Sequence, residues 1–353
     1  MSPWLTEPVR TLDESAREMA RARQVHLTKP PGSLGRLEAL ALDLAAMQGR
    51  ACPRIDDPVI TVFAADHGVA RAGVSAFPQA VTAAMVRNFA SGGAAISVLA
   101  RQWQARFEVV NLGTVEPLEP LDGVTDRRLG PGTADWRVAS AMTAPQFEQA
   151  LRAGAQALVP ALERNEAGAG DLLVGGEMGI GNSTSAAALV CALLDVDPTG
   201  VVGPGSGVDE AGMSRKVRAI RQGLGFHGAS LRDPVEALRR LGGFEIAALT
   251  GAYIAAAQRG MPVLVDGFIA GSAALAAVHI NPGVRDWLIF AHRSAEPGHG
   301  CILQALGARP LLDLELRLGE GSGAALALPL LHAACALHAD MATFETAGVP
   351  THE

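Results

Sequence analysis

The sequence predicts an α/β fold in which a parallel β-sheet is covered by helices on both faces. Short runs rich in β-branched residues alternate with longer Ala-rich stretches, and glycine or small polar residues follow each run. Strands that alternate with helices are typical of right-handed βαβ units, which build parallel sheets. Ligands of such sheets bind beyond the carboxyl ends of the strands, so the residues after each run are candidate site residues.

The chain opens with a predicted helix. Thr11-Leu12-Asp13-Glu14 has the S/T-x-x-E form of a capping box, and a polar helical segment follows to about Thr28, where the breaker KPPGSLG begins. Five strands are then expected in order, each a short run with β-branched or aromatic residues. They span residues 59–65, 107–112, 172–175, 261–265 and 287–290.

Composition limits the class of protein. The 353 residues are long enough for one large α/β domain, alone or with a smaller companion. With 49% hydrophobic and 18% charged residues and a net charge of −7, the chain has no basic excess that would favour nucleic acid or an anionic membrane. Aromatic residues are only 4%, which argues against base-stacking platforms. We expect no nucleic-acid or membrane partner, and an anionic substrate needs a local site.

The chain carries no evident targeting segment. Its first residues, MSPWLTEPVRTLDES, lack the basic and apolar regions of a secretory signal, so a cytoplasmic location is expected. The most apolar stretch near the C-terminus is interrupted by Pro329, His332 and His338, so no membrane span is expected. The four cysteines are scattered without a CxxC pair, which predicts reduced, small core residues.

A glycine-rich stretch, GGEMGIGNSTSAAAL, follows the third predicted strand. From Gly176 it has P-loop spacing, but Asn182 replaces the lysine, which argues against an ATPase. It also departs from the G-x-G-x-x-G fingerprint of dinucleotide-binding proteins. A glycine-rich turn that leads into a helix presents free N–H groups and a positive dipole end, which suits one phosphate. The alternative is a tight strand-to-helix turn required only by packing, and the motif alone does not decide between them.

Other polar motifs give weaker signals. A second glycine-rich turn, GPGSGVDEAGMSRK, ends at Lys216, which by itself resembles a solvated surface lysine. The absence of HExxH and of other zinc spacings predicts no metal site, and the absence of G-x-S-x-G argues against a serine hydrolase. The residues considered and set aside as metal half-sites are Asp66, His67, His292, Glu296 and His299.

A single carboxylate stands out in LRLGEGSGAALALPLL, residues 316–331. Gly319 and Gly321 flank Glu320 and allow the backbone to approach a ligand closely. The apolar run after Gly323 is expected to form a wall for a flat hydrophobic molecule, and a carboxylate against such a wall can act as a general base. The alternative is an N-cap or first-turn Glu stabilised by the helix dipole.

Taken together, the motifs resemble one family, the nicotinate-nucleotide–dimethylbenzimidazole phosphoribosyltransferases. The matching stretches run in order through nearly the whole chain, and the ordered set is highly specific. Besides GGEMGIGNSTSAAAL they are KPPGSLGRLE (29–38), AADHGVARAGVSAFPQAVT (64–82), GGAAI (92–96), VDGFIAGSAAL (265–275), HRSAEPGH (292–299) and LRLGEGSGAALA (316–327).

The resemblance implies a reaction and an architecture. The phosphoribosyl group of nicotinate mononucleotide moves to 5,6-dimethylbenzimidazole, giving α-ribazole 5′-phosphate and nicotinate with inversion at the anomeric carbon, without a cofactor. The implied protein is a homodimer. Its Rossmann-like large domain is expected at residues 30–305, and a small helical domain from both chain ends, 1–29 and 306–353, is expected to complete the active site.

The resemblance also implies roles for individual residues. Glu320 of the LGEG motif is the expected catalytic base, and Ser75 is expected beside the benzimidazole. The expected phosphate and ribose contacts are Glu177, Gly179, Gly181, Asn182, Ser183, Lys216, Gly267 and Ser294. The chain departs from the family pattern at Pro204, Ser206, Ala84 and Ala291, which leaves the preferred base open.

A second class of function remains. A non-catalytic nucleotide-binding or sensor protein could use the same fold, because fold does not imply function. Retention of Glu320 favours the enzyme, since a protein that only binds has no need of a base.

Overall fold

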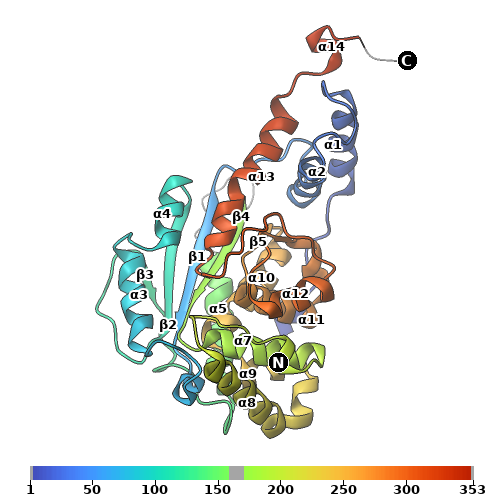
Figure 1. Ribbon diagram of the computed structural model, residues 1–353. Helices are drawn as coiled ribbons and strands as arrows, with labels where there is room; N and C mark the ends of the chain where they lie inside the picture. The colour runs from blue at the N-terminus through green and yellow to red at the C-terminus, as the bar shows by residue number, and fades with distance from the viewer. Residues whose placement is uncertain (1–2, 159–170, 351–353) are drawn as a thin grey trace.

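The computed structural model describes residues 3–158 and 171–350, and six parallel strands form its central sheet (Figure 1). The strand order is β3-β2-β1-β4-β5-β6, which is the order of the doubly wound dinucleotide-binding fold. The strands are β1 (Pro58–Ala65), β2 (Arg106–Gly113), β3 (Val124–Asp126), β4 (Leu172–Met178), β5 (Val263–Val265) and β6 (Leu288–Phe290). The predicted parallel α/β fold is therefore confirmed.

The five predicted strands are all present, with two differences. β4 continues to Met178, so Glu177 lies on a strand and not in the loop after it. The edge strand β3 was not predicted, because its three residues, Val-Thr-Asp, are too few to show a pattern. Every residue of β1 is buried, as expected for a strand covered on both faces.

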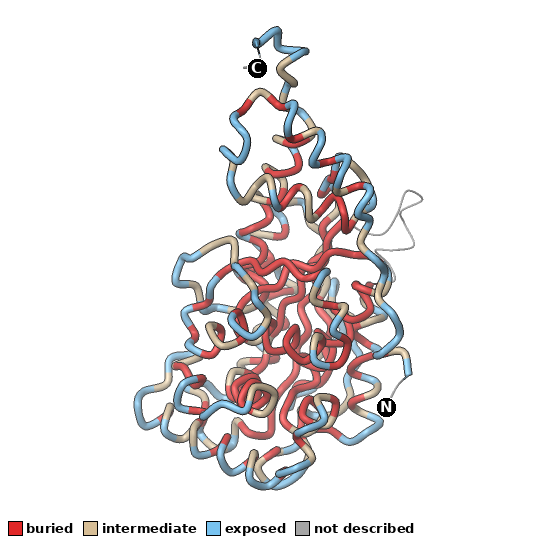
Figure 2. The backbone as a smooth tube through the Cα atoms, turned by 90° about the vertical axis from the view of Figure 1, so that its right-hand side faces the viewer, coloured by how far each residue is buried: buried red, intermediate tan, exposed pale blue. Residues whose placement is uncertain are grey.

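Helices cover both faces of this sheet. On one face α10 (Phe244–Arg259) and α11 (Phe268–Ile280) contact the strands, and α5 (Ala144–Ala157) packs on α10. On the other face lie α3 (Ala80–Ala90), α4 (Ala95–Gln102) and the first part of α13 (Ser322–Asp340). Figure 2 shows the buried backbone concentrated between these layers. α10 is apolar and buried almost all round, as expected for a helix inside a large core.

The remaining helices connect or flank these elements along the chain. They are α1 (Glu14–His26), α2 (Arg36–Gln48), α7 (Asn182–Leu194), α8 (Glu210–His227), α9 (Pro234–Leu241), α12 (Pro297–Ala305) and α14 (Phe344–Ala347), with 3-10 helices η1 (Pro3–Thr6), η2 (Gly68–Ala72), η3 (Pro198–Gly200), η4 (Gly228–Arg232) and η5 (Pro282–Trp287).

Elements from both chain ends lie side by side. α1 and α2 pack together, and α2 packs against α13 (Figure 1). The Arg23 guanidinium donates to the backbone oxygens of His338 at 2.7 Å and Ala339 at 2.5 Å. The predicted cap of α1 is wrong, because Asp13 accepts from the Ala16 N–H at 2.9 Å and the helix begins at Glu14. Thr11 lies two residues before this N-cap, Asp13. The predicted domain boundaries stay a prediction.

Two stretches are long and apolar enough to cross a membrane by length and composition alone, Ala80–Gln102 and Ser322–Asp340. The first is divided into α3 and α4 near Gly92 and Gly93. In the second, 56% of the most apolar 18-residue segment is buried inside the protein, as expected for a helix that packs against the core. The prediction of core cysteines is correct for Cys191 and Cys335, which are buried, but Cys52 is exposed and Cys301 is half-buried.

Candidate active site

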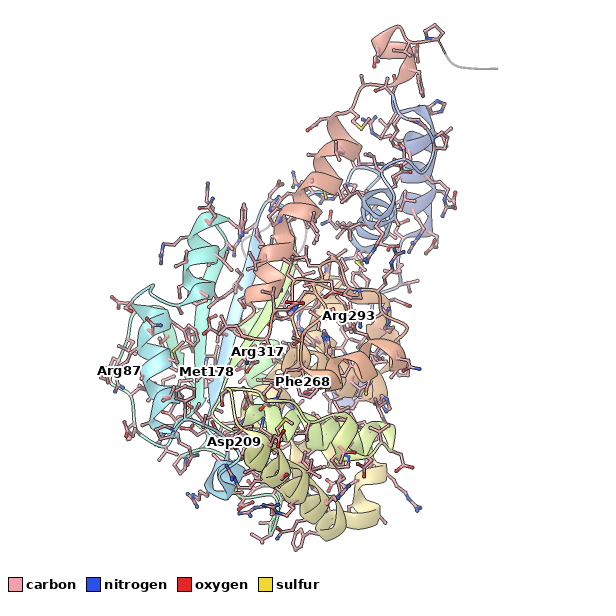
Figure 3. The ribbon with its side chains drawn as sticks, in the orientation of Figure 1. Arg87, Met178, Asp209, Phe268, Arg293 and Arg317 are labelled. Atoms are coloured by element: carbon pink, nitrogen blue, oxygen red, sulfur yellow. The ribbon has the colours of Figure 1, made fainter. Side chains whose placement is uncertain are left out.

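A cavity of about 640 Å³ lies at the carboxyl ends of β4, β5 and β6. Its walls also include residues of the loop before α3 and of the segment that leads into α13. Figure 3 labels Met178, Phe268 and Arg317, which belong to this wall and come from β4, α11 and the segment before α13. The cavity is next to the point where the strand order reverses, between β1 and β4, where doubly wound folds bind ligands.

The structure brings nearly all the predicted site residues to this cavity. Lys216 is the exception, because it lies behind the wall and contacts the lining residue Ser183. Those that line the cavity are Ser75, Glu177, Gly179, Gly181, Asn182, Ser183, Gly267, Ser294 and Glu320.

The glycine-rich turn joins β4 to α7 and faces the cavity. Gly181 is the residue before α7 and has φ +99°, a conformation that favours glycine. A Cβ at Gly179 would lie 2.2 Å from the carbonyl oxygen of Ala65, so close packing also requires glycine there. The two interpretations of this motif are therefore compatible: packing explains the glycines, and Gly181, Asn182 and Ser183 at the start of α7 still line the cavity, although the Asn182 N–H donates to the Gly179 oxygen at 3.1 Å.

Lys216 is buried, which corrects its interpretation as a surface lysine. Its side chain comes from α8, and Nζ donates to Ser183 Oγ at 3.2 Å and to the Gly203 carbonyl oxygen at 3.0 Å. Burial lowers the pKa of Lys216. Among residues 3–158 and 171–350 no carboxylate lies within 4.0 Å of Nζ. The charge of Glu296 acts on this ammonium group and raises its pKa against the larger effect of burial, and a bound anion would add a second negative partner.

Glu320 occupies an unusual backbone turn. Gly319 has φ +86°, Glu320 φ +66° and Gly321 φ +86°, so a residue with a side chain adopts the left-handed conformation between two glycines. That conformation costs an L-residue roughly 1–2 kcal/mol, so the surroundings must hold it. The carbonyl of Glu320 packs against β4, where a Cβ at Gly176 would lie 2.1 Å from its oxygen. The side chain is 6% exposed, and Oε2 has no hydrogen-bond partner among residues 3–158 and 171–350.

Hydrogen bonds fix this turn on three sides. The Gly319 carbonyl accepts from the Ser322 backbone N–H at 3.0 Å and from its hydroxyl at 2.7 Å. The Glu320 N–H faces the Glu177 carboxylate and lowers its pKa, and the Gly321 N–H donates to Asp266 Oδ2 at 3.3 Å. Helix α13 begins at Ser322 with Gly321 as its N-cap, so Glu320 precedes the helix. The alternative of an N-cap or first-turn Glu is therefore wrong.

Buried acids surround the turn, and their charges raise the pKa of Glu320 and of Glu177. Burial raises the pKa of Glu320, the Ile96 backbone N–H at the start of α4 lowers it, and the Asp266 charge raises it again, with a net increase. Burial and the charges of Glu245 and Asp266 also raise the pKa of Glu177 well above its usual value. A carboxylate with a raised pKa is a better proton acceptor than an ordinary Glu.

The predicted apolar wall is in the wrong place. The residues after Gly323 do not line the cavity, because α13 runs from the site into the core and buries its apolar side chains there. Residues that the sequence analysis did not single out take this role. Val81 and Met85, four residues apart on α3, share one helix face, a spacing that could have found them. The apolar lining is Phe77, Val81, Met85, Met178, Ile180, Phe268, Ile269, Leu316 and Leu318.

The residues set aside as metal half-sites make protein contacts. Asp66 accepts from the Thr82 hydroxyl at 2.6 Å, and His67 bonds to Ser185 Oγ at 2.9 Å and to Glu245 Oε1 at 2.6 Å. Within the part of the chain that the structure describes, no three His, Cys, Asp or Glu side chains form a metal-binding group.

The histidines and the glutamate after β6 form a second polar group. His292 Nε2 lies 3.4 Å from Asp266 Oδ1, and His299 Nδ1 accepts from the Ser294 N–H at 2.9 Å. Glu296 Oε1 accepts from the Gly205 N–H at 2.9 Å. Burial lowers the pKa of His299 to about 3, so this ring is neutral and serves as an acceptor.

Comparisons with known proteins agree with this geometry. A family model described as phosphoribosyltransferase matches residues 9–349. The chain belongs to the nicotinate-nucleotide–dimethylbenzimidazole phosphoribosyltransferase family. It is 58% identical over 347 residues to the enzyme of that name from Azotobacter vinelandii, covering 98% of this chain and 97% of that protein. A Pseudomonas aeruginosa enzyme of the same name is 58% identical over 346 residues, with 98% and 97% covered.

Solved structures of the phosphoribosyltransferase family share the whole fold. A crystal structure of the Thermus thermophilus enzyme superimposes with a TM-score of 0.89 at 44% identity, covering 97% of this chain and 100% of that one. A second Thermus thermophilus structure gives 0.90 at 45% identity, with 96% and 100% covered. The resemblance inferred from the motifs is therefore confirmed.

The departures from the family pattern lie at different distances from the cavity. Ser206 lines it, and its hydroxyl lies 3.2 Å from Ser75 Oγ. Pro204 precedes the lining residue Gly205, Ala84 is exposed on α3, and Ala291 is buried at the end of β6, and none of these three lines the cavity. Of the four departures, only Ser206 lines the cavity.

Proposed function

We propose that the chain transfers the phosphoribosyl group of nicotinate mononucleotide to 5,6-dimethylbenzimidazole, giving α-ribazole 5′-phosphate and nicotinate. The reaction class follows from membership of the family, whose relatives are named for this nucleotide and this base. The alternative of a non-catalytic sensor has no support from these relatives. The test is to incubate the protein with both substrates and measure nicotinate and the new nucleotide together, with each substrate alone as the control.

The bonds and charges of this transfer define what the site must do. The bond from the anomeric carbon to the pyridinium nitrogen breaks, and its electron pair neutralises the departing nicotinate ring. One ring nitrogen of the benzimidazole bonds to the same carbon from the opposite face, which inverts it. The attacking ring would become cationic, so its other nitrogen must lose its proton. A base at the ring edge therefore assists the step.

Glu320 is the observation that carries this proposal. Its carboxylate lies in the wall of a cavity that is mostly apolar on one side, and Oε2 has no hydrogen-bond partner in the part of the chain that the structure describes. Its raised pKa makes it a stronger proton acceptor than a solvated Glu. We assign Glu320 as the general base, with the apolar side chains Phe77, Met85 and Leu318 positioned to hold the ring.

The phosphate and ribose are assigned to the opposite side of the cavity. The start of α7 offers the backbone of Gly181, Asn182 and Ser183, and Lys216 lies directly behind Ser183. Gly267 and Ser294, which follow β5 and β6, complete this side. The positive N-terminal end of α7 and the buried ammonium group of Lys216 suit a monophosphate. Such a local site is needed because the chain is acidic overall.

Replacing Lys216 tests this phosphate site. Charge-assisted hydrogen bonds contribute roughly 1.5–3 kcal/mol, so Lys216→Ala should lower kcat/KM for the nucleotide by about tenfold to a hundredfold. Steady-state kinetics with varied nucleotide measure this loss. Arg221→Ala on the same helix is the control, because Arg221 is exposed and pairs with Asp197. Wild-type kinetics for Lys216→Ala would contradict the assignment.

The pH dependence tests the ionisation of Glu320. A general base must be ionised, so kcat/KM for the benzimidazole should fall as the pH decreases through the pKa of Glu320. Since burial raises that pKa, this acid limb should lie at higher pH than for a solvated Glu. The profile is measured at saturating nucleotide for wild type and Glu320→Gln, and the limb should be absent from the variant. A limb shared by both proteins would assign it to another group or to the base itself.

The oligomeric state and the location belong to the same proposal. We expect a homodimer in the cytoplasm, on the resemblance to the family, and a small domain from both chain ends that completes the site. Light scattering after size exclusion measures the first of these directly. We expect no metal or cofactor in the reaction, because the nicotinate ring leaves as a neutral aromatic nitrogen without assistance.

A further inference from the structure

Asp266 joins the end of β5 to the start of α13. The side chain is 2% exposed, and its two oxygens accept from two backbone N–H groups: Oδ2 from Gly321 at 3.3 Å and Oδ1 from Ala324 at 2.8 Å. The N-cap of α13 is a glycine with no side chain to cap the helix. Asp266 therefore caps α13 from a different part of the chain, and the same carboxylate holds the residue that follows Glu320.

The side chain of His292 also contacts the Asp266 carboxylate. His292 Nε2 lies 3.4 Å from Asp266 Oδ1, and both side chains are buried. The ring fills space that glycine leaves open, since a Cβ at Gly323 would lie 2.2 Å from His292 Cδ2. Burial lowers the pKa of His292, but the hydrogen bond and charge of Asp266 raise it, with a net increase. The pair therefore favours an imidazolium beside the carboxylate.

We propose that Asp266 is a positioning residue for the transfer, which holds the Gly319–Gly321 turn and thereby places the Glu320 carboxylate at the cavity wall. The turn needs such a support, because Glu320 adopts a left-handed conformation that its own side chain disfavours. Ser322 and Glu177 hold the first half of the turn, and Asp266 holds its second half. This inference rests on the proposed role of Glu320 as the base.

Asp266 also acts on Glu320 through its charge. The acids that face the turn are Glu177 from β4 and Asp266 after β5, and the cation beside them is His292 after β6. The negative charge of Asp266 raises the pKa of Glu320. Loss of this charge should lower that pKa, which a purely mechanical support would not do.

The variant Asp266→Asn tests both effects. An amide offers one acceptor oxygen, and its NH₂ group would face a backbone N–H donor, so the two hydrogen bonds cannot both form. We expect kcat to fall about tenfold to a hundredfold, because small displacements of a catalytic group are costly, while KM for the nucleotide changes by less than about threefold. The acid limb of kcat/KM for the benzimidazole should move to lower pH, and comparison with wild type cancels the titration of the base itself.

A second readout needs no activity. Amide hydrogen exchange of a peptide that covers residues 319–326 should be faster in Asp266→Asn than in wild type. Asp233→Asn is the matched control, since Asp233 caps α9 through the Val235 N–H at 2.9 Å and Asn caps a helix as well as Asp. It should leave the rate, the pH profile and this exchange unchanged. If Asp266→Asn does not fold, Asp266→Ser carries the test, because a hydroxyl still caps the helix but cannot hold both N–H groups.

The outcomes separate this proposal from the proposed function. Wild-type exchange or a wild-type kcat in a folded Asp266 variant overturns the positioning role, whether or not Glu320→Gln loses its rate. Faster exchange with lower kcat and a shifted acid limb supports it. If Glu320→Gln keeps the full rate, the base role fails, and the positioning role fails with it even where exchange is faster.

Discussion

Glu320→Gln is expected to lower kcat by about 10²–10⁴-fold, equivalent to roughly 3–5 kcal/mol of transition-state stabilisation. Glutamine keeps the shape of the side chain but cannot take the proton from the benzimidazole. Steady-state kinetics give kcat, and titration of both substrates should show binding close to that of wild type.

The control for this loss is Glu210→Gln, which makes the same chemical change at an exposed residue of the first turn of α8. It should keep the wild-type rate. A Glu320→Gln protein that turns over normally would return this residue to a structural role. Loss of benzimidazole binding with an intact rate constant would make it an orienting contact.

Gly176→Ala is expected to lower kcat by about a hundredfold, although residue 176 touches no substrate in this account. A Cβ there would lie 2.1 Å from the carbonyl oxygen of Glu320 and 2.6 Å from its carbon, and both atoms are backbone, so the turn itself must move. Overpacking of this kind typically lowers the free energy of unfolding by about 1–3 kcal/mol, so the variant should still fold. Kinetics together with a thermal melt measure both effects.

Gly225→Ala on α8 is the matched control for this substitution, because a Cβ at Gly225 meets nothing within 4 Å. It should keep the wild-type kcat and leave stability equal or higher, since Ala favours a helix over Gly. An active, folded Gly176→Ala protein would show that Glu320 does not depend on this contact.

The fold was predictable because its signals are local. Alternation of β-branched runs with Ala-rich segments marks the strands, and every predicted strand is present. The features that were not predicted correctly are a strand of very few residues and a helix cap for which two nearby residues are suitable. β3 has only three residues, and at the start of α1 both Thr11 and Asp13 can cap a helix, so local sequence cannot decide between them.

The site was predictable where glycines mark it and obscure where long-range packing forms it. Closely spaced glycines indicate the turns at Gly179–Gly181 and Gly319–Gly321, and both turns face the cavity. Whether Lys216 is buried depends on α7 and on the segment around Gly203, which are distant in sequence. The apolar run after Gly323 looked like a pocket wall, but its direction relative to the sheet is a tertiary property.

The interplay of Asp266 with the Glu320 turn illustrates the same limit. Asp266 follows β5 and Gly321 precedes α13, and 55 residues separate them. Only the order of β4, β5 and β6 in the sheet brings them together. A sequence motif around either residue contains no sign of the other.

The measurement that tests the central claim most directly compares two acceptor bases in single-turnover reactions of wild type and Glu320→Gln. 5,6-Dichlorobenzimidazole is similar in size to 5,6-dimethylbenzimidazole but has a more acidic N–H, so its proton leaves more easily without a base. If Glu320 takes that proton, the rate lost in Glu320→Gln should be smaller for the dichloro base than for the dimethyl base. An equal loss for both bases, or no loss for either, would contradict the account.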